Sequence, residues 1–167
     1  AASTGALPGF LEESELRGFL HCHTNYSDGS NTVADLARGV QAAGYGWIGI
    51  TDHSQSAAYA GGLSPEALRQ QAAEIAEVAA GMPGFRILHG VEADILADGR
   101  LDYDDDVLAR LDFVIGSVHS RFNLSGAEMT ARVLTALDNP YLTILGHPTG
   151  RLLLSRDAYA IDLEAVF

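Results

Sequence analysis

Short apolar runs alternate along the chain with segments that have the spacing of amphipathic helices. The apolar runs predict five strands, at residues 18–22, 47–51, 86–91, 113–118 and 142–146. Apolar positions three and four residues apart predict helices at residues 33–43, 65–80, 105–111 and 127–137, and a last helix that begins near residue 162. Five strand–helix units in succession are typical of an α/β fold built on a parallel sheet, open or closed.

The residues at the predicted helix ends agree with this pattern. Ser64 followed by Pro65 is a favourable N-cap and first helical residue, and Ser125 with Glu128 fits a capping box. Glycines stand where the first two helices are expected to end. Local chemistry therefore supports the helices that periodicity predicts.

One domain with its own core is expected, because the chain has 167 residues and 47% of them are hydrophobic. Residues 1–16 are small, polar and acidic and show no period, so we interpret them as a linker or domain edge and residues 17–167 as the domain. The single cysteine, Cys22, excludes an intrachain disulfide, and no signal peptide or membrane-spanning run is visible. These features favour a cytoplasmic protein that does not associate with membranes.

The charge balance changes the picture of possible partners. A formal net charge of −12, from 22 acidic and 10 basic residues, repels a nucleic-acid backbone unless bound cations or another domain offset it. Every basic side chain is an arginine, whose planar fork suits phosphate oxygens. Arg121 and Arg151 follow two of the predicted strand ends, where each either holds a phosphate or pairs with one of the many acidic side chains.

Polar side chains stand at the end of every predicted strand. These strand-end groups are His21-Cys22-His23, Asp52-His53, Glu92-Ala93-Asp94, His119 and Gly146-His147-Pro148. Because the carboxyl ends of parallel strands share one crevice or barrel mouth, the side chains are expected to converge there. The sixth histidine, His89, lies inside a predicted strand, and we interpret it as a packed or solvent-facing residue.

The histidines and carboxylates predict a metal site with more than one ion. His21 and His23 are two residues apart in an extended segment, so both rings are expected on one side, with Cys22 facing the wall. Imidazole with carboxylate suits zinc, manganese or iron. A carboxylate such as Glu92 can bridge two metals about 3.5–4 Å apart.

The remaining acidic residues divide into two groups. Asp28 lies in an Asp-Gly pair typical of a turn, but it follows His23 closely enough to reach the same mouth, and we include it as a candidate ligand. Asp94, on the same strand face as Glu92, is a candidate for a supporting position beside the metals. A solvated helix start is the interpretation for the acidic run Asp102, Asp104, Asp105 and Asp106.

The motifs at the strand ends resemble those of the polymerase and histidinol phosphatase (PHP) superfamily. They are His21-Cys22-His23-Thr24, Ser27-Asp28-Gly29, Ile50-Thr51-Asp52-His53-Ser54, Gly90-Val91-Glu92, Ser117-Val118-His119-Ser120 and Leu145-Gly146-His147-Pro148. Two longer stretches, residues 51–63 and 146–153, are similar to the C-terminal domain of bacterial and archaeal family X DNA polymerases. The resemblance covers roughly residues 17–167.

The resemblance implies an α/β fold, a distorted (β/α)7 barrel of which about five βα units are present, with two or three divalent metals (Mn2+ or Zn2+, or Fe2+). By matching motif, the ligands would be His21, His23 and Glu92 for one metal, Glu92, His119 and His147 for a second, and Asp28 and His53 for a third. It also implies manganese-dependent 3′–5′ exonuclease action on DNA ends in DNA repair, with polymerase domains N-terminal to this segment. In that chemistry Glu92, His119, Arg121 and Arg151 would be the catalytic residues.

Two departures from the family pattern keep other functions open. Phe19 stands where the family often has an aspartate, two residues before the first ligand histidine. The family also places a final Asp-x-His pair on strands beyond Phe167, so seven of nine expected ligands are present and the domain is expected to be C-terminally incomplete. The alternatives are a phosphatase acting on a small phosphomonoester and a non-catalytic module that braces a polymerase.

Overall fold

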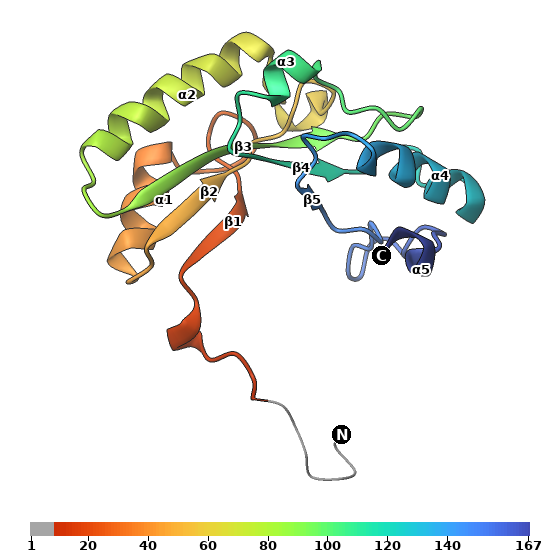
Figure 1. The fold of residues 1–167 in the computed structure, drawn as a ribbon, viewed down its shortest axis with the longest axis horizontal. Coiled ribbons are helices and arrows are strands. Elements are labelled where there is room, and N and C mark those ends of the chain that lie inside the picture. The colour runs from red at the N-terminus through yellow and green to blue at the C-terminus, as the bar shows by residue number, and fades with distance from the viewer. Residues whose placement is uncertain (1–8) are drawn as a thin grey trace.

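The computed structural model describes residues 9–167, and its centre is a sheet of five parallel strands that neighbour one another in sequence order. The strands are β1 (Gly18–Cys22), β2 (Trp47–Ile50), β3 (Arg86–Asp94), β4 (Phe113–Ser117) and β5 (Ile144–Leu145). They curl into a half-barrel with helices on the outside (Figure 1). The predicted α/β fold with five strand–helix units is confirmed.

Helices connect the strands as the periodicity predicts. They are α1 (Val33–Ala42), α2 (Pro65–Ala80), α3 (Asp105–Leu108), α4 (Gly126–Leu137) and α5 (Leu163–Val166), with short 3-10 turns η2 (Glu13–Glu15) and η3 (Ala58–Ala60). Ser64 accepts a hydrogen bond from the Ala67 N–H at 3.2 Å, and Ser125 forms the predicted capping box with Glu128. α3 is shorter than predicted, because the chain leaves the helix after Leu108 to enter β4.

Strand β5 covers only residues 144–145 of the predicted 142–146, whereas β3 is longer than predicted and continues to Asp94 instead of ending at Val91. The first half of β3 pairs with β2 and its second half pairs with β4, from Gly90 opposite Phe113 to Asp94 opposite Ser117. Glu92 therefore lies within the strand rather than after it. A carboxylate interrupts the apolar run there, so hydrophobic pattern alone ends the strand too early.

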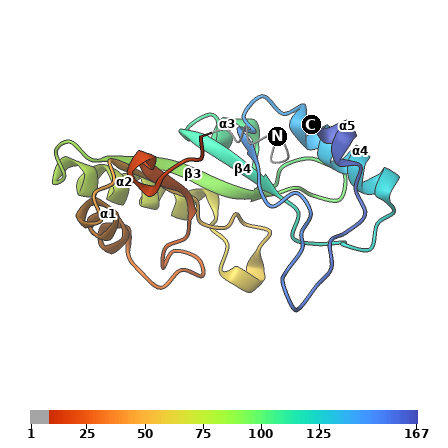
Figure 2. The same ribbon diagram turned by 90° about the horizontal axis from the view of Figure 1, so that it is seen from below.

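Two apolar clusters pack against the sheet, one at its first strands and one at its later strands. Val33, Ile48 and Ile50 belong to the first, between α1, α2 and the strands β1 to β3. Val114 and Met129 belong to the second, between α4 and the later strands. Both clusters leave the carboxyl ends of the strands free, and in Figure 2 the loop after β1, the turn η3 and the loop after β5 all project below the sheet.

Part of the predicted linker, residues 1–8, lies outside the described residues. Residues 9–16 are exposed and contain only η2. Within residues 9–167, no helix combines the length and the apolar character needed to cross a membrane.

Candidate metal centre

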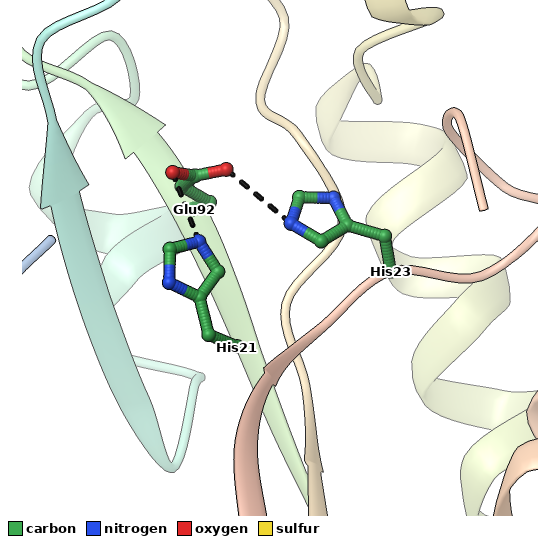
Figure 3. Close-up of side chains that lie close together, drawn as sticks. All are labelled: His21, His23 and Glu92. Carbon is green, nitrogen blue, oxygen red and sulfur yellow. Dashed lines mark ion pairs between the residues drawn. The ribbon is translucent and has the colours of Figure 1, made fainter. Parts of the chain in front are cut away.

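Glu92 is the centre of the site. It is 1% exposed, and imidazole nitrogens from five histidines surround its carboxylate. Around Oε1 lie Nε2 of His21 (2.9 Å), His147 (2.9 Å) and His119 (3.3 Å), and around Oε2 lie Nδ1 of His53 (3.1 Å) and Nε2 of His23 (3.4 Å). Figure 3 shows His21 and His23 directed at Glu92 from the end of β1. The histidines predicted to converge at the strand ends do so.

Asp28 gives the cluster a second carboxylate. Its two oxygens lie 3.4 Å from His23 Nδ1 and 3.6 Å from His53 Nε2, and its side chain is 52% exposed. Donor atoms come within 4.8 Å of one another in three groups: His21, His23 and Glu92; His23, Asp28 and His53; and His53, Glu92 and His119. The structure therefore brings together all seven side chains that sequence reasoning selected as ligands.

The donor chemistry of this cluster fits divalent metals. Nδ1 of His23 and Nδ1 of His53 are buried without a hydrogen-bond partner among the described residues. Buried polar atoms in proteins are nearly always satisfied, so two orphaned ring nitrogens in one cluster call for a partner outside the chain. Neutral imidazole with carboxylate is a donor set typical of zinc, manganese or iron. A metal ion bound here would satisfy these atoms.

The electrostatics of the cluster keep Glu92 ionised. Burial acts to raise the pKa of Glu92, but hydrogen bonds from His119, His147 and His21 hold it far below its usual range. Burial and the neighbouring His53 lower the pKa of His23, which leaves that imidazole neutral and able to donate a lone pair. A buried carboxylate anion beside a neutral imidazole is suited to holding a cation.

Asp94 contacts the ring nitrogen of His119 that does not face Glu92. Asp94 is 7% exposed, and its Oδ1 lies 2.6 Å from His119 Nδ1, on the opposite side of the ring from Glu92. Burial lowers the pKa of His119, but the two carboxylates outweigh it and raise the pKa to about 9. A carboxylate on the second ring nitrogen fixes the orientation of a ligand histidine, which agrees with the supporting position expected for Asp94.

The backbone at two histidines is strained. His21 has φ 62° and His147 has φ 22°, in the region that side chains other than glycine rarely adopt. The pairing of β1 with β2 shifts between Phe19 and Cys22, so β1 carries a bulge. The expectation of a regular extended segment at His21 was therefore wrong: the bulge, and not simple alternation, turns both rings toward Glu92. Cys22 faces away from the cluster and packs against the first apolar cluster, as expected.

Asp52, which sequence reasoning assigned no role, organises the loop after β1. Its carboxylate is fully buried and accepts hydrogen bonds from the N–H and hydroxyl of Thr24, from the N–H and hydroxyl of Ser27, and from Gln71 Nε2. These distances range from 2.5 to 3.2 Å. The loop that carries Asp28 is thus fixed to the end of β2. A carboxylate that follows a buried strand directly was the available signal.

Asp102 was predicted to be solvated, and this was wrong. It is 6% exposed and accepts hydrogen bonds from Ser54 Oγ, from the Ser56 N–H and from the Asp94 N–H. A reversal of the chain that pairs Ile95 with Leu101 returns it to the loop after β2, and periodicity does not detect such a reversal. The rest of the acidic run, Asp104 to Asp106, is exposed as predicted.

Several candidate residues lie away from the cluster. Arg121 and Arg151 are exposed, and neither side chain forms a hydrogen bond or ion pair with any residue from 9 to 167. His89 contacts Gln71 Oε1 at 3.2 Å instead of a strand-end histidine, as its packed interpretation requires. Phe19, which stands where the family often has an aspartate, packs edge-on against Tyr45.

Comparison of the sequence with known proteins shows the family of the chain. The model of the PHP domain matches residues 20–153. The chain is 47% identical over 154 residues to a Bacillus subtilis protein named DNA polymerase/3′-5′ exonuclease PolX, covering 92% of this chain and 27% of that protein. It is 32% identical over 150 residues to a probable phosphatase of Caldicellulosiruptor bescii, covering 87% of this chain and 58% of that protein.

The chain thus spans about a quarter of the polymerase relative and somewhat over half of the phosphatase relative. The family match includes all seven clustered side chains: six lie between His21 and His119, and His147 lies near its end. The chain belongs to the PHP domain family.

Proposed function

We propose that this chain is a metal-dependent phosphoesterase domain that hydrolyses phosphodiesters at a multinuclear centre. The observation that carries the proposal is the buried Glu92 carboxylate with five imidazoles around it and two ring nitrogens left without partners. His21, His23 and Glu92 would hold one ion, Glu92 with His119 and His147 a second, and Asp28 with His53 a third. His23 lies close enough to Asp28 and His53 to contribute there as well.

Bound divalent metals would supply a nucleophile, by lowering the pKa of a coordinated water to about 7, and would polarise the phosphate. The residues of the chain provide the rest. The buried Glu92 carboxylate would contribute its charge to holding divalent ions, and Asp94 keeps His119 in one orientation. Arg121 and Arg151 lie on the loops after β4 and β5 and are free to neutralise phosphate oxygens. Cations would also offset the acidic balance of the chain where an anionic substrate enters.

We infer that the substrate is the end of a DNA strand, processed in the 3′–5′ direction during DNA repair in the cytoplasm. The identity of 47% to a protein named as a polymerase and 3′-5′ exonuclease supports this. Polymerase domains N-terminal to this segment would supply most of the affinity for DNA, because the chain itself has a net charge of −12.

A phosphatase acting on a small phosphomonoester is the second candidate. Relatives named probable phosphatase, at 32% identity for one of them, favour it. The same metals serve both reactions, and the size of the opening decides between them. A non-catalytic module bracing a polymerase is the third candidate, and Phe19 in place of a supporting carboxylate favours it.

Hydrolysis of two substrates with manganese supplied separates the three candidates. A 5′-labelled DNA oligonucleotide and p-nitrophenyl phosphate are compared for the wild type, Glu92→Ala and the exposed control Glu66→Gln. We expect shortening of the oligonucleotide by the wild type and by Glu66→Gln only. Cleavage of the monoester alone favours the phosphatase. Nuclease activity that survives Glu92→Ala excludes catalysis at this centre.

A further inference from the structure

The loop after β5 holds one arginine, Arg156, in a fixed orientation. Its guanidinium carbon lies 3.8 Å from the centroid of the Phe122 ring, and its Nε donates a hydrogen bond to the Gly150 carbonyl at 2.9 Å. Phe122 is itself backed by the ring of Tyr159, nearly parallel to it at 6.1 Å. Arg156 also pairs through its backbone with Leu152, which closes the loop. Arg156 is thus positioned before any ligand arrives.

The guanidinium of Arg156 has no anionic partner among the described residues. Arg38, Arg69 and Arg100 pair with nearby carboxylates, whereas Arg156 pairs with none in that part of the chain. The two terminal nitrogens of Arg156 form no hydrogen bond within residues 9–167. A planar, pre-oriented fork with free donors matches the oxygens of a phosphate. Arg121 and Arg151, by contrast, have no side-chain contact that orients them.

Arg156 connects the two loops that follow His119 and His147. Phe122 follows His119 by three residues, and Gly150 follows His147 by three, so the contacts of Arg156 join the loops after β4 and β5. Tyr59, 71% exposed, has its ring 6.0 Å from the ring of His53 and 6.3 Å from that of His119. Burial and the carboxylates of the cluster raise the pKa of Tyr59, while the charge of Arg156 opposes them. Tyr59 lies in η3 and Arg156 in the loop after β5, and both segments project on the same side of the sheet (Figure 2).

The loop that carries Arg156 also exposes apolar side chains. Leu153 and Leu154 form the tip of the loop after β5 and are 70% and fully exposed. An exposed aromatic ring, an oriented cation and an apolar tip match the parts of a nucleotide, namely a base and sugar next to a phosphate. A small aliphatic phosphomonoester has no ring that could stack on the aromatic side chain.

We propose that Arg156 binds the phosphate that flanks the scissile one in a single nucleic-acid strand, while Tyr59 stacks on a base at the same opening. The flanking phosphate is assigned because Arg156 contacts none of the clustered histidines or carboxylates. This inference rests on the proposed function, since it assumes that the centre receives a phosphodiester. It makes Arg156 a residue that selects a nucleotide chain over an isolated phosphoester.

Kinetics with two diester substrates test the assignment. The purified protein, with manganese, is given either a short single-stranded oligonucleotide or the p-nitrophenyl ester of thymidine 5′-monophosphate, which has only the scissile phosphate. We expect Arg156→Gln to raise KM for the oligonucleotide about tenfold at nearly unchanged kcat, and to leave the single-phosphate substrate unaffected. Arg156→Lys should lie between, because it keeps the charge and loses the fork. The exposed control Arg38→Gln should match the wild type.

Binding without hydrolysis separates this inference from the proposed function. Fluorescence anisotropy of the labelled oligonucleotide is measured with calcium in place of manganese at several salt concentrations. Loss of one phosphate contact in Arg156→Gln should reduce the salt slope by about 0.7. If the wild type binds but never hydrolyses, and the variant binds more weakly with this smaller slope, the proposed function fails, while the binding of a strand phosphate by Arg156 stands.

Three results overturn the inference. The first is that Arg156→Gln, with an unchanged melting temperature, keeps both the oligonucleotide KM and the salt slope of the wild type. The second is an equal fall in kcat for both substrates, which places Arg156 on the scissile phosphate instead. The third is a wild-type protein that does not bind the oligonucleotide at all.

Discussion

Two loops border the metal centre, and they are built in opposite ways. The loop after β1, residues 23–32, is fixed from below by the buried carboxylate of Asp52. The loop after β5, residues 147–158, is exposed over residues 151–158 and is held by its own turns and by Arg156. In the proposed site the first loop carries Asp28, whose position needs a fixed geometry, and the second loop meets the substrate beyond the ligand His147. The difference teaches that a buried carboxylate anchors the loop that holds a ligand, whereas the substrate loop lacks such an anchor among the described residues.

Asp52→Ala removes the anchor of the first loop and is expected to have the largest effect on the free energy of unfolding. The substitution leaves the buried donors of Thr24, Ser27 and Gln71 without an acceptor. An unsatisfied buried donor costs about 1–3 kcal/mol, so we expect a loss of about 3–5 kcal/mol in the free energy of unfolding, measured by urea denaturation. Asp98→Ala, at an exposed aspartate, is the control and should change it by less than about 0.5 kcal/mol. Equal effects of the two variants contradict a fixing role for Asp52.

Much of this architecture could be predicted from the sequence, because its signals are local. The strands alternate with helices as the apolar periods indicate, and Ser64 and Ser125 cap the helices they were expected to cap. The convergence of the histidines followed from one topological rule, that parallel strands end on one side of a sheet. The five histidines and Glu92 needed no contact information beyond this rule, and Asp28 was selected because it follows His23 closely.

The supporting residues could not be predicted in the same way. Asp52, Asp102 and Arg132 act through partners far away in the sequence, and nothing in their neighbourhoods names those partners. Arg156 is oriented by Phe122, which lies on a different loop. Sequence reasoning selected Arg121 and Arg151 because they follow histidine motifs, although neither is held by a side-chain contact.

The second largest effect concerns Arg132, which joins α4 to the segments after β3 and β4. Its 4% exposed guanidinium donates hydrogen bonds to the carbonyls of Ile95, Leu96 and Ser120. Arg132→Met keeps the buried chain but leaves these acceptors unpaired, so we expect a loss of about 3 kcal/mol in the unfolding free energy. Arg110→Met, at an exposed arginine in the turn after α3, serves as the control. A loss below about 1 kcal/mol for Arg132→Met would exclude an anchoring role.

A smaller effect is expected from pH in protein treated with a chelator. The folded-state pKa of His119, raised to about 9 by Asp94 and Glu92, exceeds the ordinary value of about 6.5. Protonated His119 therefore stabilises the fold fully below about pH 6.5, and this stabilisation is lost as pH rises through about 9. The stability difference between the wild type and Asp94→Asn should shrink by about 1–2 kcal/mol over that window. A difference independent of pH contradicts the pairing of His119 with Asp94.

The smallest effect belongs to the tip of the loop after β5. Leu154 is fully exposed and has φ 63°, a conformation that costs a leucine about 1 kcal/mol and a glycine almost nothing. Leu154→Gly should raise the unfolding free energy by about 0.5 kcal/mol, because relief of strain slightly exceeds the added entropy of the unfolded chain. Leu153→Gly, at a position without positive φ, should lower it slightly. The opposite order of the two variants would show that the tip is not strained as described.

The central claim is that Glu92 and its histidines form a multinuclear centre that hydrolyses phosphoesters. The most direct test measures metal content by mass spectrometry and manganese-dependent hydrolysis of bis(p-nitrophenyl) phosphate in the same samples of wild type and Glu92→Gln. We predict about two or more ions per wild-type chain, loss of at least one in the variant, and a fall in hydrolysis of about 100-fold or more. Equal metal content and equal rates in the two proteins would contradict the claim.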